Sequence, residues 1–304
     1  MDEAKIPLLA IAGPTASGKT ALAVKLALAL NGEVVSADSM QIYRGMDIAT
    51  AMPTPGEMRG VPHHLLGIVE PDARFSVAQY APLAHAAIQG IYARGKLPIL
   101  CGGTGLYIQA VVENLTLTEG EFTQDGAGTW QELQFIDSAA AAKIHPNDQK
   151  RISHALALYR STGVTLTEQN LRSRRAPSPY GARMIFLNAR ERQNLYDRID
   201  RRVDQMLQMG LLEEAGVRRR EAGGTAAQAI GYKELEPYFL GQCTLEEAVD
   251  HLKRETRRYA KRQLSWFRRM AREWNERVPG SCAELFIEDN DLLEQAERQC
   301  KCPS

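Results

Sequence analysis

The chain has 304 residues, 44% of them hydrophobic and 24% charged, which is enough apolar material for one large domain or two ordinary ones. No stretch approaches the roughly 20 consecutive apolar residues of a membrane-spanning helix, and the short apolar run before Gly13 is typical of a strand rather than a signal peptide. These features argue against a membrane protein and a disordered chain, and we expect a folded cytoplasmic protein.

Charge is distributed unevenly along the chain. Lys and Arg total 37 and Asp and Glu total 37, but residues 1–150 hold 10 basic against 15 acidic residues, and residues 151–304 hold 27 against 22. A local basic surface attracts nucleic acid whatever the net charge is. The cysteines are odd in number and lack zinc-site spacing, so we expect free thiols. They are Cys101, Cys243, Cys282, Cys300 and Cys302.

Apolar segments alternate with helical segments through much of the chain, which predicts an α/β fold with a mainly parallel sheet flanked by helices. From Arg190 onward the sequence reads as helical and highly charged. The expected strands are Ile6–Ala12, Glu33–Ser39, Pro98–Cys101 and Met184–Asn188; helices are expected over Lys19–Leu30 and just before Pro146, a loop over Arg172–Arg183, and a break at Glu221–Gly224.

The stretch GPTASGKT, from Gly13 to Thr20, has the pattern G-x-x-x-x-G-K-[ST] between an expected strand and an expected helix. Its backbone N–H groups would bind a phosphate, Lys19 adds a positive charge, and the Thr20 hydroxyl can ligate Mg²⁺. Because ligands bind beyond the carboxyl ends of parallel strands, this loop, Asp38 and Thr104 should share one crevice. Neither candidate for the metal-binding strand of an NTP-hydrolysing protein fits: one ends in Cys and Gly, and the other, ending in Asp38, is followed by a segment unlike a switch or a kinase lid. The loop is therefore expected to hold a diphosphate that leaves.

Further blocks in fixed order extend this pattern: SADSMQIYRGMDIATA at Ser36–Ala51, PHHLL at Pro62–Leu66, FSVAQY at Phe75–Tyr80, GGTGLY at Gly102–Tyr107, IHPNDQKRI at Ile144–Ile152, RIDRRVDQMLQMGLLEE at Arg198–Glu214, AIGYKEL at Ala229–Leu235 and AKRQLSWFR at Ala260–Arg268. Together with the phosphate loop they resemble the bacterial tRNA dimethylallyltransferases, also called tRNA isopentenyltransferases, from about Pro7 to Arg269. No internal repeat is present.

The resemblance implies transfer of a dimethylallyl group from dimethylallyl diphosphate to N6 of adenosine 37, in tRNAs reading codons that begin with U, with Mg²⁺ as cofactor. It implies Asp38 as the general base, Thr104 as a residue that positions the reacting groups, and Arg202 (or, as second choice, Arg198) as the arginine that neutralises the diphosphate. A structural role is the alternative for each: a helix cap for Asp38, a turn hydroxyl for Thr104, and surface ion pairs for Arg202.

The resemblance also assigns binding residues. Diphosphate would contact Gly13, Pro14, Thr15, Ala16, Ser17, Gly18, Lys19 and Thr20, and the metal ligand would be Thr20. By the resemblance, the tRNA anticodon stem-loop would contact Asp38, Ser39, Met40, Gln41, Gln149, Lys150, Arg151, Ile152, Ser153, Gly231, Tyr232 and Lys233, and the basic pattern of the C-terminal region adds Arg258 and Arg262. Adjacent His63 and His64 have no evident third ligand, so a loop role is expected rather than a metal site.

The segment His251–Arg272 holds nine Lys and Arg and a single Glu. At helical spacing Arg254, Arg258 and Arg262 share one face, and Tyr259, Trp266 and Met270 form an apolar stripe that can dock on the body. An almost purely basic helix indicates nucleic-acid binding, although a solvated charged helix is the alternative.

The expected domains are a transferase core over residues 1–112 and 145–240, a shortened insertion over 113–144, and a basic helical C-terminal region over 241–304. The insertion is shorter than the family's usual one, and Met52 stands where a lysine is common. We expect a monomer. Three other functions stay open: a small-metabolite kinase, an isopentenyltransferase acting on free adenine nucleotides, and an RNA-binding module with an inactive phosphate loop.

Overall fold

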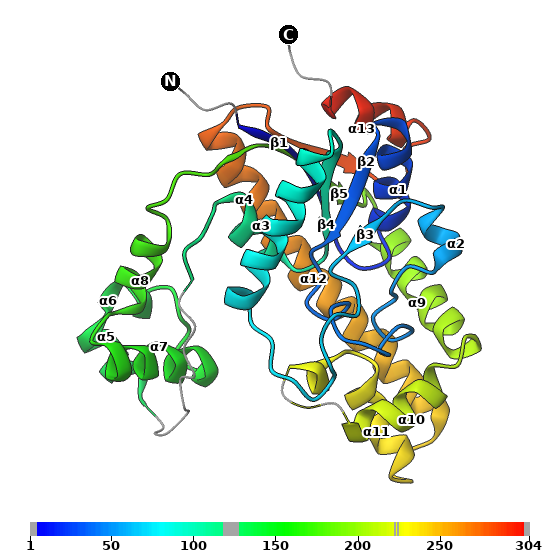
Figure 1. Ribbon diagram of the computed structural model, residues 1–304. Helices are drawn as coiled ribbons and strands as arrows, with labels where there is room; N and C mark the ends of the chain where they lie inside the picture. The colour runs from blue at the N-terminus through cyan, green and yellow to red at the C-terminus, as the bar shows by residue number, and fades with distance from the viewer. Residues whose placement is uncertain (1–4, 118–127, 222, 224, 301–304) are drawn as a thin grey trace. The chain divides into compact units, whose positions relative to one another are not determined.

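The computed structural model describes residues 5–117, 128–221, 223 and 225–300 (Figure 1). Its backbone contacts divide the chain into two compact units, Met1–Gln109 with Pro179–Ser304 (unit 1) and Ala110–Ser178 (unit 2). The sequence placed the insertion at 113–144, so unit 2 extends further toward the C-terminus than expected.

Unit 1 contains a six-stranded parallel sheet in the order β3-β2-β4-β1-β5-β6. Central strands read as continuous apolar runs because helices cover both faces of such a sheet. This confirms the α/β fold predicted from the sequence. The strands are β1 Ile6–Ala12, β2 Gly32–Ser36, β3 His63–His64, β4 Leu97–Gly102, β5 Tyr180–Asn188 and β6 Cys282–Phe286.

The helices of unit 1 connect these strands and continue beyond β5. They are α1 Lys19–Ala29, α2 Pro55–Met58, α3 Val77–Ala93, α9 Arg192–Gln208, α10 Leu211–Glu221, the 3₁₀ turn η1 Ala226–Gln228, α11 Tyr232–Phe239, α12 Leu245–Arg277 and α13 Leu292–Cys300, while α4, Gly105–Val112, leads into unit 2. Within the described residues, no helix is long and apolar enough to cross a membrane.

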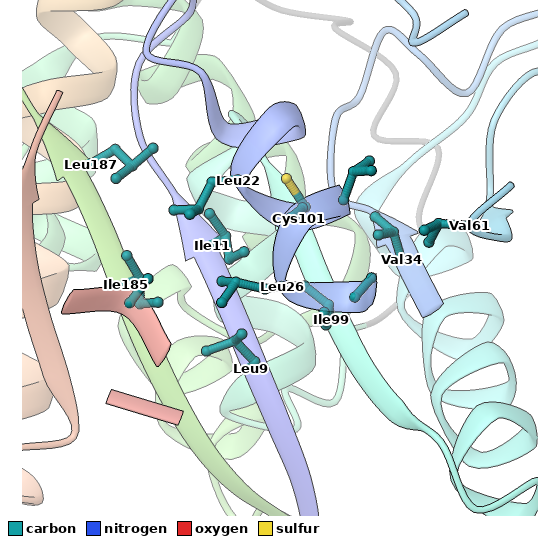
Figure 2. Packing of buried hydrophobic residues seen from close by; sticks show 14 of the residues in the cluster. Leu9, Ile11, Leu22, Leu26, Val34, Val61, Ile99, Cys101, Ile185 and Leu187 are labelled. Carbon is teal, nitrogen blue, oxygen red and sulfur yellow. The ribbon is translucent and has the colours of Figure 1, made fainter. Parts of the chain in front are cut away.

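One face of the sheet packs against α1 and α13. Leu9, Ile11 and Ile99 of the strands meet Leu22 and Leu26 of α1 in a buried cluster (Figure 2). Alternate strand residues point to this face, as the period of two requires. The cluster holds the start of α1, and with it the end of the glycine loop, against the sheet.

The opposite face of the sheet is covered by α12, which contacts β5 and β6 and runs as one long helix in Figure 1. Thr244 and Glu247 form a capping box at its start. Phe267 is fully buried and its ring lies 5.9 Å from that of Phe186 on β5. Met270 is buried and Trp266 is half-buried, as the apolar stripe predicted.

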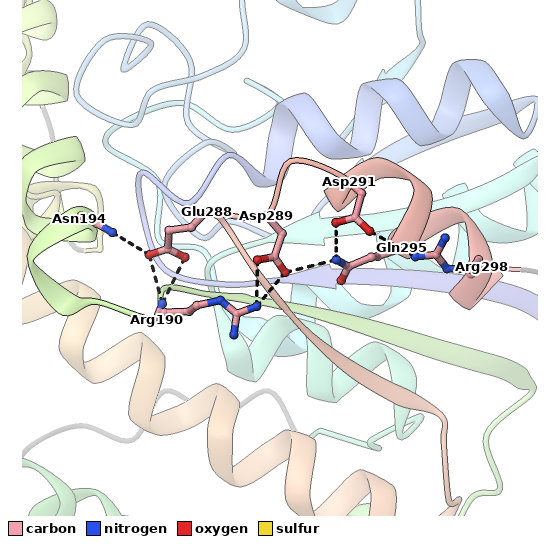
Figure 3. Close-up of polar contacts among 7 residues, drawn as sticks. All are labelled: Arg190, Asn194, Glu288, Asp289, Asp291, Gln295 and Arg298. Atoms are coloured by element: carbon pink, nitrogen blue, oxygen red, sulfur yellow. Dashed lines mark hydrogen bonds and ion pairs between the residues drawn. The ribbon is translucent and has the colours of Figure 1, made fainter.

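The helical reading of the chain from Arg190 onward missed β6, which pairs in parallel with β5 from Met184↔Cys282 to Asn188↔Phe286. The side chain of Arg190 donates two hydrogen bonds to Asp289, at 2.9 and 3.1 Å, and its backbone N–H lies 3.2 Å from Glu288 (Figure 3). The short strand has mixed polarity, so its own residues carry little strand signal, and pairing with β5 decides its conformation.

Unit 2 is a helical unit with its own core. Leu133, Ile152 and Leu156 are fully buried in it, and the indole N–H of Trp130 lies 3.0 Å from the carbonyl oxygen of Ile144. The helices over Gln149–Thr162 and Leu166–Ser173 complete this core, so they belong to unit 2 and not to the sheet-containing unit. The helices are α5 Trp130–Ile136, α6 Ser138–Ala141, α7 Gln149–Thr162 and α8 Leu166–Ser173. Residues 118–127 of the expected insertion, 113–144, lie outside the described residues.

Candidate functional site

The phosphate loop connects β1 to α1, as expected. Ala16 and Gly18 both have left-handed backbone conformations, with φ of 61° and 88°, which turn the loop around the N-terminus of α1. The Ser17 hydroxyl is buried and has no hydrogen-bond partner within the described part of the chain. The Lys19 ammonium donates to the carbonyl oxygen of Pro14 at 2.6 Å. An orphaned hydroxyl and an ammonium folded into the loop fit a site that takes a phosphate group.

Lys19 lies in an environment that disfavours its charge. Burial lowers its pKa to about 8; Cys101 and Asp38 oppose this shift, whereas the neighbouring Arg202 adds to it. An incoming anion would reverse the effect, because it favours the charged ammonium. Burial also raises the pKa of the Cys101 thiol to about 12, so this group beneath the loop is neutral at physiological pH.

Asp38 and Thr104 follow the carboxyl ends of neighbouring strands β2 and β4, and hydrogen bonds join Thr104 to Ala37 and Ser39, the residues on either side of Asp38. The Thr104 hydroxyl accepts from the Ser39 N–H at 2.9 Å, and the Thr104 N–H donates to the Ala37 carbonyl at 3.1 Å. Asp38 Oδ1 accepts from the Met40 N–H at 2.9 Å, whereas Oδ2 makes no hydrogen bond to any described residue. One oxygen therefore fixes the carboxylate while the other is free to accept a proton.

Helix α9 brings two arginines to the phosphate loop. Arg198 Nε donates to the Ala16 carbonyl oxygen at 2.8 Å. Arg202 is half-buried and its guanidinium makes no ion pair or hydrogen bond among the described residues. Burial lowers its pKa, which Glu57 and Asp38 partly oppose and Arg198 reinforces. Spacing of four residues places both arginines on one face of the helix.

The acidic residues near Arg202 on α9 form ion pairs with basic residues of α12. Asp200 accepts from Arg257 at 2.5 and 2.7 Å, and Asp204 pairs with Lys253 at 2.6 Å. The ion-pair alternative raised for Arg202 by the sequence is therefore wrong, and its charge is available to an anionic ligand. Two of the basic residues of α12 have a structural role instead of an RNA-facing one.

Residues of α12 that sequence reasoning did not select also reach the site. Gln263 is buried and lies between the phosphate loop and the Gly102–Thr104 loop. Burial raises the pKa of Tyr259, as does Asp38, and hydrogen bonds with Gln263 and Thr104 act in the opposite direction. A polar Gln among the buried Ala260, Leu264 and Phe267 was the signal available in the sequence.

The glycines of GGTG are required by close approaches. A Cβ on Gly103 would touch the Gln263 amide, and one on Gly105 would overlap the indole of Trp266. A Cβ on Gly102 would overlap the Ala37 backbone. These glycines therefore let α12 and the end of β2 come close to the site.

The predicted RNA contacts of unit 1 have mixed exposure. Ser39, Met40 and Gln41 are half-buried, and Gln41 donates to the carbonyls of the Thr50–Ala51 turn. Gly231 and Tyr232 are buried. The Gly231 N–H donates to Glu234, and the Tyr232 hydroxyl donates to Glu214, so both organise the fold. The Lys233 side chain is half-exposed and offers a charge at the surface.

The exposed face of α12 carries Arg254, Arg258 and Arg262, as predicted. Arg258 pairs with Glu255 at 2.5 Å, and the Arg262 guanidinium lies 5.7 Å from the Tyr259 ring centre. In unit 2, the N-terminus of α7 exposes Gln149, Lys150 and Arg151 and half-exposes Ser153, but Ile152 is fully buried in the core. The Ile152 side chain therefore offers no surface to RNA.

The two histidines of β3 have structural partners. His63 Nδ1 lies 2.9 Å from the Val61 carbonyl oxygen, and His64 Nε2 lies 2.8 Å from Glu33. Across the described ranges, no group of three or more His, Cys, Asp or Glu side chains could hold a metal. Cys101, Cys243, Cys282 and Cys300 are free thiols, whereas Cys302 lies outside the described residues.

A phosphate loop with a carboxylate and a hydroxyl at adjacent strand ends defines a group-transfer enzyme of the phosphate-loop α/β class. Residues 41–270 match the model of the IPP transferase family, and residues 6–67 match that of isopentenyl transferases. The tRNA dimethylallyltransferase of Halalkalibacterium halodurans is 49% identical over 286 residues, covering 88% of this chain and 90% of the relative.

Solved structures agree. The tRNA isopentenylpyrophosphate transferase of Bacillus halodurans is 43% identical with a TM-score of 0.70, and 97% of each chain is covered. A eukaryotic dimethylallyltransferase studied acting on tRNA is 28% identical with a TM-score of 0.76, covering 96% of this chain and 77% of that one. This chain belongs to the IPP transferase family, and its bacterial relatives from Halalkalibacterium halodurans and Thermoanaerobacter are named tRNA dimethylallyltransferase.

Proposed function

We propose that this chain transfers the dimethylallyl group of dimethylallyl diphosphate to N6 of adenosine 37 in tRNAs that read codons beginning with U. The observation that carries the proposal is the meeting of the phosphate loop, Asp38 and Thr104 at the carboxyl ends of β1, β2 and β4. The names of the relatives support both the donor group and the tRNA acceptor.

In the proposed step, N6 of the adenine attacks C1 of the dimethylallyl group as the C1–O bond breaks, and diphosphate leaves with the bonding electrons. One N6 proton passes to Oδ2 of Asp38, the carboxylate oxygen without a partner among the described residues. The loop amides, Lys19 and Arg202 stabilise the charge that develops on the leaving group. Thr104 holds the Asp38 segment in place through Ser39.

A Mg²⁺ ion fits the residues present. The Thr20 hydroxyl at the start of α1 would hold it together with diphosphate oxygens and water, because Mg²⁺ keeps few protein ligands where a substrate supplies phosphates. When bound, the ion would supply additional neutralisation of the diphosphate charge. The remaining phosphate oxygens would meet the Ser17 hydroxyl and the N–H groups of the loop other than that of Thr15, which donates to Gln263.

Adenosine must leave its stack to reach a half-buried carboxylate, so the RNA has to be held on both sides of the base. We propose that the exposed basic face of α12, the Ser39–Gln41 loop, Lys233, and the exposed start of α7 make these contacts. Every group used in the chemistry comes from unit 1 of one chain, which supports a monomer. Its RNA substrate implies a cytoplasmic enzyme.

The test is to incubate the protein with Mg²⁺, dimethylallyl diphosphate and unmodified tRNA carrying A36-A37, and to detect adenosine with one added C5H8 by mass spectrometry. Asp38→Asn should lower the rate by about 10²- to 10⁴-fold while keeping tRNA affinity. Asp291→Asn, at an exposed position just before α13, is the matched control and should retain full activity.

Other outcomes would reassign the site. Prenylation of AMP in place of tRNA would indicate an isopentenyltransferase of free nucleotides. Consumption of ATP with a small metabolite, without prenylated tRNA, would indicate a kinase. Binding of tRNA without any turnover in the presence of Mg²⁺ would indicate an RNA-binding module.

A further inference from the structure

The buried carboxamide of Gln263 joins two loops that are far apart in sequence. Its Oε1 accepts from the Thr15 N–H at 2.8 Å, and its Nε2 donates to the Gly103 carbonyl oxygen at 2.9 Å. Thr15 belongs to the phosphate loop and Gly103 to the turn that carries Thr104. One side chain of α12 therefore contacts both the donor side and the acceptor side of the proposed site.

The two hydrogen bonds of Gln263 link the chain segments that follow β1 and β4, just beyond the point where the pairing between these strands ends. Strands β1 and β4 are paired as far as Ala12↔Gly102, and the backbone diverges beyond that pair. A carboxamide carries the same N–H and C=O groups as a peptide unit, so Gln263 takes the place of the missing strand neighbour. Without it, the half-buried Thr15 N–H and the buried Gly103 C=O would lose their partners, which is unfavourable for groups removed from water.

The neighbourhood fixes the orientation of this carboxamide. Gly103 has no side chain, and any Cβ there would occupy the space of the Gln263 amide nitrogen. Tyr259, one turn earlier on α12, hydrogen-bonds Gln263 and Thr104. The amide therefore sits in a network that includes the residues closest to Asp38.

We propose that Gln263 is a positioning residue, which holds the phosphate loop and the Gly102–Thr104 turn at the separation that prenyl transfer requires. This inference rests on the proposed function. Transfer is sensitive to such a separation, because the reacting carbon is held through the diphosphate by one loop and the base and its support are held by the other. Binding of diphosphate alone uses the first loop and Arg202, but not the Gly102–Thr104 turn.

Two variants separate the two hydrogen bonds. Gln263→Met has a similar length and removes both, whereas Gln263→Glu keeps an acceptor for the Thr15 N–H but turns an oxygen toward the Gly103 carbonyl. The transfer rate at saturating substrates should fall about 10- to 100-fold in both variants, whereas the Kd for inorganic diphosphate should change less than about threefold. Gln205→Met, at an exposed position of α9, is the matched control and should match the unmodified protein.

Amide hydrogen exchange gives a readout that does not depend on turnover. The Thr15 N–H should lose protection in Gln263→Met and keep it in Gln263→Glu, while the Leu26 N–H inside α1 stays protected in both. The inference is overturned if Gln263→Met transfers within about twofold of the unmodified protein, if diphosphate affinity falls in parallel with the rate, or if Thr15 stays protected in Gln263→Met. Failure of the unmodified protein to prenylate tRNA would instead reject the proposed function, and Thr15 exchange would still decide whether Gln263 joins the loops.

Discussion

The side chains of Arg202 and Arg198 project from the same face of α9 but have different surroundings. Arg198 holds the Ala16 carbonyl, whereas the guanidinium of Arg202 has no partner among the described residues although burial lowers its pKa. A half-buried cation without an ion pair is costly unless a ligand neutralises it. This difference favours Arg202 as the residue that binds the diphosphate, and Arg198 as one that shapes the loop.

Arg202→Gln should therefore lower the transfer rate by about 10²- to 10³-fold, as removal of a charge-stabilising group does. It should also unfold at a denaturant concentration equal to or above that of the unmodified protein, because an uncompensated charge is removed. Arg198→Gln should reduce the rate less and lower the unfolding midpoint. Single-turnover kinetics and urea unfolding of both variants check this, and a larger rate loss in Arg198→Gln would reverse the two roles.

Glu33 at the start of β2 is a buried carboxylate with three basic partners. Arg94, Lys96 and His64 lie 2.6, 2.8 and 2.8 Å from its oxygens. Burial by itself would raise the pKa of Glu33, but the hydrogen bonds from these groups lower it to about 2. This cluster holds β2 to β3 and β4 at the end of the sheet opposite the phosphate loop.

A depressed folded-state pKa stabilises the fold above the unfolded-state pKa, near 4.5, and this contribution is lost as pH falls toward about 2. Glu33→Gln should reduce the free energy of unfolding by about 2–4 kcal/mol at pH 7, and by much less near pH 2. Glu70→Gln removes an exposed pair with Arg44 and should cost less than about 1 kcal/mol. Urea unfolding at both pH values measures this, and a pH-independent difference would contradict it.

At the scale of elements, the contact between α12 and the start of α4 depends on Gly105. Because its Cβ would overlap the rigid indole of Trp266, Gly105→Ala should cost about 1–3 kcal/mol of stability. The loss should shrink when Trp266 is replaced by Leu, since the clash is pairwise. Gly90→Ala, inside α3, meets only the flexible end of Arg94 and should be neutral or stabilising.

Thermal unfolding of the three variants and the double variant measures the coupling between Gly105 and Trp266. Equal losses from Gly105→Ala in the presence and absence of the indole would show that backbone conformation, and not the contact with α12, requires this glycine.

The sequence predicted the parts of the fold and site that are local. The strand, loop and helix from Ile6 to Ala29 carry their own signals, because glycine, lysine and hydroxyl positions and flanking apolar runs lie within one window. A polar Gln on an apolar helix face marks Gln263 as unusual, but its role could not be predicted, since its partners lie 248 and 160 residues away and no periodicity encodes them. β6 was missed for the same reason: its conformation depends on pairing with β5.

At the scale of the whole molecule, net charge is zero, so no general attraction to RNA arises from it. The excess of basic residues in 151–304 is local, and part of it is internal, because Lys253 and Arg257 pair with Asp204 and Asp200. RNA binding should therefore depend on the charges that stay exposed on α12, among them Arg258 and Arg262.

Each phosphate contact that is lost reduces the slope of log Kd against log salt concentration by about 1. Arg258→Glu should lower that slope by about 1, and the double variant with Arg262→Glu by about 2, with affinity for dimethylallyl diphosphate unchanged. Arg298→Glu on α13 makes the same change in net charge at another exposed helix position and should leave the slope unaltered. Filter binding at salt concentrations from about 50 to about 300 mM measures the slopes, because counterion release dominates affinity over roughly this range. Equal slopes for Arg258→Glu and Arg298→Glu would mean that total charge, and not the face of α12, attracts the RNA.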